Sequence, residues 1–311
     1  AGDLLGHLWK FDVSGNNTST WKVAYGTNPS PAPLYQALDG SGTPQPITAK
    51  PQVGKHPSGG LMVYFGTGKY YAVNDQIVGP SPQIHTFYGI RDQGSAVASR
   101  TNLLQQEILT EKTFEVTASN VIQTPSNPLP SDSTLIDLRA TSNTTVDYTT
   151  KDGWYMDLNV PIASPYNGNG PEGERVIAAP LLRNGRIIFV TLIPDPNPCN
   201  SGGSSWLMEL DAVNGSRLDT SPFDINNDGV IDLLDLVAIY DTNGDGNIDA
   251  LDNIPTSGIR KDGLGIIKTP GVVICDDGTE CKYSSGSSGN LDMIKESSGS
   301  PTGRQSWRQL R

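Results

Sequence analysis

The chain lacks the features that mark membrane-spanning and nucleic-acid-binding proteins. No run in its 311 residues approaches the 18 consecutive apolar residues of a transmembrane helix. Lys and Arg form no clusters and the net charge is −11, so neither nucleic acid nor an anionic membrane surface is expected as a partner. No secretory leader precedes Ala1, which opens directly onto a strand-like stretch. We therefore interpret the chain as a mature or trimmed piece without its upstream sequence.

Histidine is scarce, and this excludes the commonest catalytic arrangements. The three histidines, His7, His56 and His85, are too scattered to suggest a metal site or a Ser-His-Asp triad. A GxSxG motif at a strand-to-helix elbow is also missing. The paired carboxylates of the chain gather in one acidic stretch, where a role in ion binding is expected instead. We therefore predict no catalytic residues and no enzymatic activity.

Cysteine is equally scarce, with three residues and no CxxC zinc spacing. Cys275 and Cys281 bracket the polar turn CDDGTEC. This spacing fits either a disulfide in an oxidising compartment or two free thiols. Cys199 is then left over, free or paired with a residue outside this chain.

Glycine and proline are abundant, with 34 and 23 residues, and they separate many short strand-like stretches. Residues 2–14 and 20–26 predict a first hairpin. Residues 60–73 predict one buried strand and one edge strand joined by a tight turn. Asn-Gly pairs at 184–185 and 214–215 predict two further hairpin turns.

Three stretches are less regular. Residues 100–113 fit either a short helix or a mixed strand, because their apolar residues do not alternate. Residues 117–150 are rich in Ser, Thr, Pro and Asn and predict a long surface excursion. Residues 284–303 are rich in Ser and Gly and predict a mobile segment.

A loosely repeated unit predicts the fold class. The stretches LWKFDVSG, GWYMDLN and LMELDAVNG each hold a strand that ends in an aromatic or Leu-Asp step. Short antiparallel strands in similar units are typical of a β-propeller, which removes exposed strand edges by radial repetition. We predict an all-β fold, a complete or partial modified β-propeller forming a single domain over residues 1–311. A β-sandwich with long loops is the alternative.

The most specific motif is a tandem repeat within residues 224–252. DINNDGVIDLLD and DTNGDGNIDALD both read Asp-x-Asn-x-Asp-Gly-x-x-Asp-x-x-Asp, which is the spacing of an EF-hand calcium loop. Gly stands at the sixth position, where the backbone must curl around the ion. The predicted ligands of loop 1 are Asp224, Asn226, Asp228, the carbonyl of Val230, Asp232 and Asp235. Those of loop 2 are Asp241, Asn243, Asp245, the carbonyl of Asn247, Asp249 and Asp252.

Charge supports calcium over the alternative of a merely solvated acidic loop. Eight of the 33 acidic residues lie in this stretch without any Lys or Arg, and the rest of the chain holds 25 acids and 22 bases. One or two calcium ions would relieve that repulsion, whereas magnesium demands a tighter octahedron and keeps its waters. Position twelve is Asp rather than the usual bidentate Glu, and residues 236–240 are too short for the helices of a paired sensor. The pattern therefore favours a structural calcium insertion.

Seven motifs occur in order along nearly the whole chain: GDLLGHLWKFDV, VYFGTGKYYAVND, FYGIRD, GWYMDL, GERVIAAPLL, IIFVTLIPDPNPCNSGGSSWLMELDAVNG and GRQSWRQLR. This series resembles the C-terminal domain of PilY-type type IV pilus biogenesis and adhesion proteins. The resemblance implies a modified β-propeller with an inserted calcium loop. It implies an extracellular protein at the pilus tip or outer cell surface, with minor pilins or other tip proteins and a host or abiotic surface as partners. Its expected roles are pilus assembly, motility and adhesion.

The chain departs from that family in two respects. It has two tandem loops where one is expected, so the second calcium site rests on spacing alone. It has Arg91-Asp92 without an intervening Gly, so the integrin-type recognition of some members is not carried over.

Two other functions fit parts of the sequence. A calcium-stapled scaffold or adhesion module would bind a cohesin-type partner, which a pull-down would detect. A quinoprotein-like propeller enzyme would need a calcium ion with an open coordination position facing the quinone, and a loop filled by its own side chains offers none.

Overall fold

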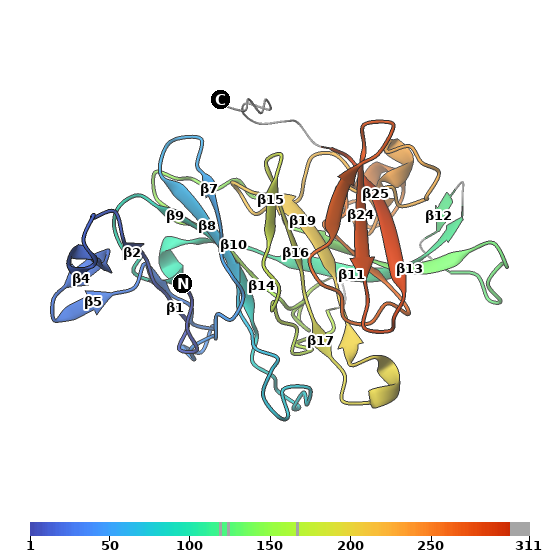
Figure 1. The fold of residues 1–311 in the computed structure, drawn as a ribbon. Coiled ribbons are helices and arrows are strands. Elements are labelled where there is room, and N and C mark those ends of the chain that lie inside the picture. The colour runs from blue at the N-terminus through green and yellow to red at the C-terminus, as the bar shows by residue number, and fades with distance from the viewer. Residues whose placement is uncertain (118–119, 123–124, 166–167, 299–311) are drawn as a thin grey trace.

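Short β-strands dominate the computed structural model, which describes residues 1–311 except 118–119, 123–124, 166–167 and 299–311 (Figure 1). A five-stranded sheet forms the first half of the molecule, and its strands are antiparallel except for the parallel pair β10 and β14. In spatial order its strands are β10 (Leu104–Gln106), β14 (Gly153–Asp157), β9 (Thr86–Asp92), β8 (Leu61–Gly66) and β7 (Gln52–Lys55). Strand β9 is buried along its whole length, as expected of a central strand covered on both faces.

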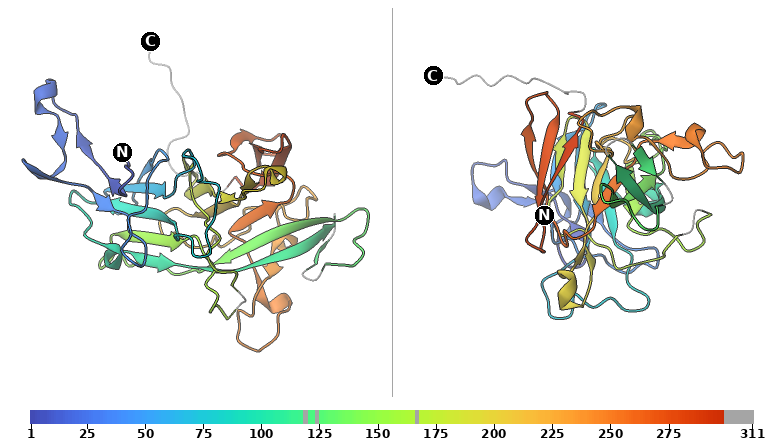
Figure 2. Two further views of the ribbon diagram at one scale, coloured as in Figure 1. Left: turned by 90° about the horizontal axis from the view of Figure 1, so that it is seen from below. Right: turned by 90° about the vertical axis from the view of Figure 1, so that its right-hand side faces the viewer.

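A seven-stranded sheet forms the second half, and every neighbouring pair in it is antiparallel. In spatial order its strands are β12 (Asn120–Ile122), β11 (Ile108–Thr117), β13 (Thr134–Thr141), β22 (Gly258–Lys261), β19 (Leu207–Asp211), β16 (Arg186–Val190) and β15 (Leu181–Arg183). The long pair β11 and β13 projects at one end of the molecule, and the N-terminal hairpins project at the other (Figures 1 and 2).

Smaller sheets complete the fold. A three-stranded sheet contains β23 (Gly271–Ile274), β24 (Glu280–Ser285) and β25 (Leu291–Glu296). The two-stranded pairs are β1 (His7–Leu8) with β6 (Tyr35–Gln36), β2 (Phe11–Asp12) with β3 (Lys22–Val23), β4 (Tyr25–Thr27) with β5 (Ser30–Ala32), β17 (Ile193–Pro194) with β18 (Gly203–Ser204), and β20 (Val237–Ala238) with β21 (Asn253–Ile254).

The described residues form five helical turns, all of the 3₁₀ type. They are η1 (Thr18–Thr20), η2 (Arg100–Asn102), η3 (Pro198–Asn200), η4 (Leu233–Asp235) and η5 (Ala250–Asp252). Within the ranges that the structure describes, no helix has the length and apolar character needed to cross a bilayer.

Aromatic residues join the two large sheets. The rings of Phe87 on β9 and Phe189 on β16 stack with centroids 3.8 Å apart, and Trp154 and Trp206 are fully buried in the same cluster. Arg139 is also fully buried there, and its guanidinium lies 4.1 Å from the ring of Trp206. Aromatic rings bury more apolar area than other side chains, so the rings between the two sheets fix how the sheets pack.

Buried ion pairs attach the three-stranded sheet to the seven-stranded one. Lys282 on β24 contacts the carboxylates of Glu209 on β19 and Glu296 on β25, and all three side chains are buried. Arg186 on β16 also pairs with Glu209, at 3.0 Å. Charges removed from water persist only when they are paired, so this cluster sets the position of β24 and β25.

Two predicted irregular segments are instead regular. The surface excursion predicted for 117–150 is wrong for residues 134–141, which form β13 within the seven-stranded sheet. The polar composition of this stretch suggested exposure to solvent. The charge of Arg139 is instead paired inside the protein, with Glu111 at 2.5 Å and Glu174 at 2.8 Å. The prediction of a mobile segment at 284–303 is wrong for residues 284–296, which contain the end of β24 and the whole of β25. Residues 299–303 lie outside the described residues.

Two of the turn predictions are also wrong. Asn214–Gly215 is not a hairpin turn, because no strand follows β19 directly. A Cβ at Gly215 would lie 2.2 Å from the ring of Trp154, so this glycine serves close packing. Residues 60–73 contain one strand, β8, rather than the predicted two. In place of the edge strand, Gly68 makes an isolated bridge to Ile47.

Other local predictions are confirmed. Strands β2 and β3 form the first hairpin, and Asn184 and Gly185 connect β15 to β16 with φ angles of 49° and 79°. Residues 100–113 combine both alternatives, a 3₁₀ turn and then strands. Cys275 and Cys281 form a disulfide, and Cys199 is free and exposed.

Candidate metal centre

The acidic stretch 224–252 lies within a connection between two neighbouring strands, β19 and β22, of the seven-stranded sheet. The sheet hydrogen bonds continue from one strand to the other, so the segment loops out without interrupting the sheet. Apolar side chains on its inner side join the core that contains residues of β11, β13 and β25, and so do its flanking residues Phe223 and Ile254. Those of the stretch itself are Ile225, Val237, Ile239 and Tyr240. We call residues 224–252 the calcium insertion, after the ion that their sequence motifs predict. Hydrophobic packing against this core holds it in place.

Loop 1 curls around its own carboxylates. Asp224 Oδ2 accepts a hydrogen bond from the amide of Gly229 at 2.9 Å, and Asn226 Oδ1 accepts one from Asp228 at 3.1 Å. Asp228 Oδ1 in turn accepts one from the amide of Val230 at 2.7 Å. Gly229 has φ +89°, a backbone conformation that other residues rarely adopt, which explains why the sixth position is glycine.

The last ligand position closes loop 1. Asp232 caps the short turn η4, and the carboxylate of Asp235 reaches back across the loop. Asp235 Oδ1 accepts from the amide of Ile225 at 2.7 Å, and Oδ2 accepts from that of Asp232 at 2.9 Å. Positions two, nine and twelve of the motif are thus held together by one side chain.

Loop 2 repeats these five hydrogen bonds 17 residues later, and the amide of Gly244 also donates to Asp241 Oδ1 at 2.6 Å. The amides of Gly246, Asp245 and Asn247 donate to Asp241, Asn243 and Asp245, each at 2.8 Å. The Asp252 carboxylate accepts from the amides of Thr242 at 2.7 Å and Asp249 at 3.1 Å, and Asp249 caps η5. Gly246 has φ +88°. The two loops are joined by the antiparallel pair β20 and β21, with Val237 opposite Ile254.

The two loops differ in their surroundings. Asp224, Asn226 and Asp235 of loop 1 are buried, whereas residues 242–251 of loop 2 are all exposed. Burial raises the pKa values of Asp224 and Asp235, because a carboxylate loses hydration inside the protein. The hydroxyl and amide of Thr242 instead lower the pKa of Asp252, the counterpart of Asp235.

Loop 1 also rests against the end of β25. The amide of Asp224 donates to the carbonyl of Lys295 at 3.0 Å, and the Lys295 ammonium contacts the carbonyl of Gly229 and the carboxylate of Asp277. Glu296, the next residue, forms an isolated bridge with Phe223 and belongs to the buried ion-pair cluster. Sequence reasoning missed these partners, because nothing in their local sequence relates them to the loop.

The residues of loop 1 fit a calcium ion. All predicted ligands carry oxygen donors, and Asp224 Oδ1 is buried without any hydrogen-bond partner. A buried, unpaired carboxylate oxygen is costly unless a cation neutralises it. In the described ranges no three His, Cys, Asp or Glu side chains converge at metal-binding spacing, and the loop carboxylates point instead to loop amides.

Comparison with known proteins shows to which family this chain belongs. A model described as the PilY1 beta-propeller domain matches residues 1–125. A Type IV pilus biogenesis factor PilY1 homolog from Xylella fastidiosa is 39% identical over 215 residues, 68% of this chain, and PilY1 from Pseudomonas aeruginosa is 30% identical over 296 residues, 85% of this chain. The crystal structure of the P. aeruginosa PilY1 C-terminal domain superposes with a TM-score of 0.72 at 27% identity, covering 96% of this chain and 57% of that one. The chain belongs to the PilY1 family.

The matches differ in how much of the chain they cover. The family model ends at residue 125, before the calcium insertion begins, whereas the structural match extends over almost the whole chain. The chain spans only 13% of the Xylella relative and 22% of the Pseudomonas one. These relatives are pilus biogenesis factors by name, and none of the matches indicates a catalytic family.

Proposed function

We propose that this chain is a calcium-binding part of a type IV pilus biogenesis factor, located at the pilus tip or outer cell surface. Its partners would be minor pilins or other tip proteins, together with a host or abiotic surface to which the pilus attaches. The names of its relatives support the pilus role. The observation that carries calcium binding is the buried, unpartnered Asp224 Oδ1 within a loop whose hydrogen bonds recur in a second copy.

Loop 1 would hold its ion through Asp224, Asn226, Asp228, the carbonyl of Val230, Asp232 and Asp235. Loop 2 would use Asp241, Asn243, Asp245, the carbonyl of Asn247, Asp249 and Asp252. Two ions would reduce the charge of the insertion from −8 to −4, and with it the repulsion between the two loops. External calcium would then set how firmly the insertion is fixed to β25, and through β25 to the rest of the sheet.

Calorimetric titration of chelator-treated protein tests the metal. We expect two calcium-binding events, with magnesium as the control cation that binds more weakly. A silent calcium titration would contradict the proposal. One event would restrict it to loop 1, whose buried oxygen makes the stronger case.

The pilus role is tested in the organism. Replacing the genomic copy by an Asp224→Asn and Asp241→Asn double variant should reduce surface pili, twitching motility and surface attachment. Asp132→Asn is the matched control, since Asp132 is exposed and far from the insertion in sequence. Normal pili and motility after deletion of the whole gene would refute the assignment to pilus function.

A further inference from the structure

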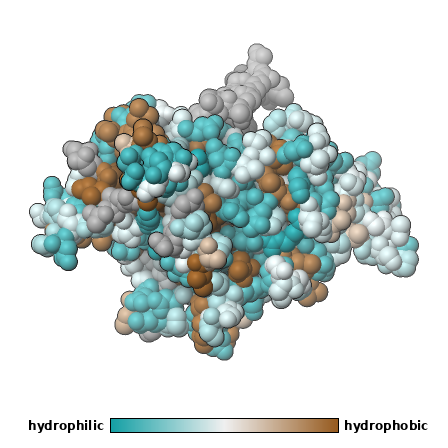
Figure 3. Space-filling model, turned by 180° about the vertical axis from the view of Figure 1, so that it is seen from behind, coloured by the Kyte–Doolittle hydropathy of each residue, from teal (hydrophilic) through white to brown (hydrophobic). Residues whose placement is uncertain are grey.

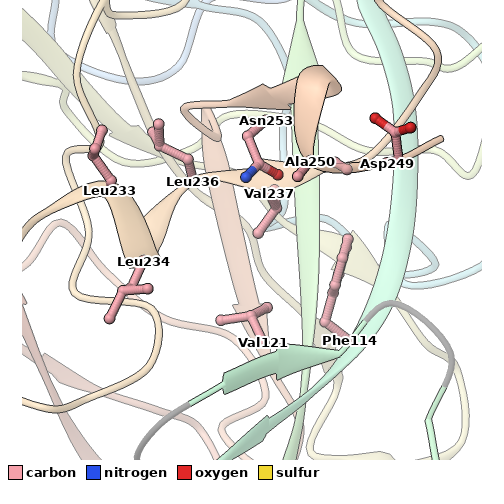
Figure 4. A pocket seen from close by; sticks show the side chains of 10 residues that line it. Phe114, Val121, Leu233, Leu234, Leu236, Val237, Asp249, Ala250 and Asn253 are labelled. Atoms are coloured by element: carbon pink, nitrogen blue, oxygen red, sulfur yellow. The ribbon is translucent and has the colours of Figure 1, made fainter.

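The outer side of the calcium insertion forms an apolar groove against the edge of the seven-stranded sheet (Figure 4). We call it the insertion groove. Its volume is about 340 Å³, within the range of small binding sites. Strands β11 and β12 contribute Phe114 and Val121, and the end of loop 1 contributes leucines. Asp249 of loop 2 and Asn253 of β21 form the polar side.

Large apolar side chains at this groove are exposed rather than packed. Leu233 and Leu234 of η4 are 78% and 57% exposed, although the next strand, β20, enters the core. Leu251 of η5, which does not line the groove, is 77% exposed as well. Figure 3 shows brown side chains next to strongly hydrophilic ones on the back of the molecule, on the side where the insertion lies. Exposed apolar groups gathered in this way mark an interaction surface.

The charge around the groove restricts its occupant. The insertion holds eight Asp and no Lys or Arg, and Asp249 lines the groove itself. The insertion stays acidic even with two calcium ions bound. A matching segment must therefore carry large apolar side chains between cationic ones.

The end of this chain has that composition. Residues 299–311, GSPTGRQSWRQLR, contain Trp307 and Leu310 and no acidic residue. Their three arginines, Arg304, Arg308 and Arg311, flank the two apolar side chains. Arginine suits such a site because its planar group pairs with carboxylates and stacks on apolar surfaces.

The end of β25 places this segment within reach. The amide of Ser297 donates to the carbonyl of Pro222 at 2.9 Å, so the chain leaves the sheet beside the start of the insertion. Ile225, three residues further on, donates to Asp235 of η4 at 2.7 Å, and η4 carries Leu233 and Leu234. Residues 299–307 can extend over roughly 30 Å, ample for Trp307 to reach those leucines.

We propose that the C-terminal segment 299–311 docks in the insertion groove of its own chain. Trp307 and Leu310 cover Leu233 and Leu234, and the arginines pair with carboxylates of the insertion. The docking itself does not require calcium. Calcium would strengthen the docking by fixing the positions of η4 and η5, and this part of the proposal rests on the proposed function.

Hydrogen exchange on the full chain tests this contact. In calcium buffer, amides of residues 233–238 should exchange at least tenfold more slowly in the native chain than in a Trp307→Ala and Leu310→Ala double variant. Leu291→Ala is the control, because Leu291 is 80% exposed on β25 and outside the groove. Equal exchange in the native chain and the double variant would overturn the proposal.

A labelled peptide of residues 299–311 gives the second measurement. It should bind the double variant, and Leu234→Asp introduced into that variant should weaken binding at least tenfold. Protection that rises with protein concentration together with dimer formation would assign the groove to a second copy and overturn docking within one chain. Calcium titration of the same samples separates the two proposals. Peptide binding without calcium binding refutes only the metal sites, and calcium binding without peptide binding refutes only the docking.

Discussion

The two loops of the insertion share one ligand sequence and five corresponding hydrogen bonds, yet they lie in different surroundings. Loop 1 is packed against β25, and Asp224 and Asp235 are buried. Loop 2 projects into solvent, and apart from Asp252 its ligand residues are exposed or half-buried. The comparison shows that the motif dictates the local curl, whereas the neighbouring strands dictate how deeply its carboxylates are buried.

The largest expected difference is in calcium-dependent stability. Asp224→Asn should remove most of the stabilisation by calcium, which for one saturated site is about 2.7 kcal/mol at a hundredfold excess over Kd. Asp241→Asn should remove much less, because unfolding of the exposed loop 2 need not unfold the core. Urea denaturation with saturating calcium measures both. Equal losses in the two variants would end the distinction between an anchored and an exposed loop.

The same two variants should also differ in stability when calcium is removed. In chelator, Asp224→Asn should raise the free energy of unfolding, since it replaces a buried carboxylate whose Oδ1 has no partner. Asp241→Asn should leave it nearly unchanged, because water reaches that loop. Parallel urea curves in chelator give the comparison. A destabilised Asp224→Asn protein would mean that the carboxylate acts mainly through its bond to Gly229.

The affinities of the loops should differ by a smaller margin. We expect loop 1 to bind calcium about tenfold more tightly than loop 2, since its ligands are preorganised by β25 and burial strengthens their attraction to a cation. Calorimetry on Asp252→Asn, with loop 1 intact, and on Asp235→Asn, with loop 2 intact, measures each site alone. Tighter binding by the exposed loop would show that the cost of dehydration outweighs preorganisation.

The smallest expected effect concerns Thr242, the second position of the loop 2 motif. Thr242→Val should raise the pKa of Asp252, because the hydroxyl of Thr242 helps to lower it below the ordinary value of 3.8. A lowered pKa stabilises the folded protein above pH 3.8, and this contribution is lost as the pH falls through the lowered value. In chelator the variant should therefore be less stable than the native chain above pH 4, and the difference should shrink in stronger acid. Thr242→Ser, which keeps the hydroxyl, should match the native protein at every pH.

Much of the fold followed from local patterns. The hairpin at Asn184–Gly185 and the strands around Trp154 and Trp206 were predictable, because turn chemistry and aromatic content act over a few residues. Strand β13 was not, because its buried Arg139 is neutralised by Glu111 and Glu174, which lie 28 and 35 residues away in the chain. The mobile segment predicted from residue 284 was wrong at β25, because the serines and glycines that precede this strand form the turn of a hairpin.

The sequence alone determined the curl of both loops. The alternating Asp and Asn residues find their amide partners within a few positions, and Gly at the sixth position permits the left-handed backbone. The difference between the loops was decided by tertiary structure. Lys295 contacts loop 1, and Glu296 pairs with the preceding residue Phe223, only because β25 folds back from more than sixty residues away. Among the described strands, loop 2 has no such hydrogen-bonded neighbour beyond its pairing through β21. Burial depends on these distant contacts, so identical motifs reached different electrostatic states.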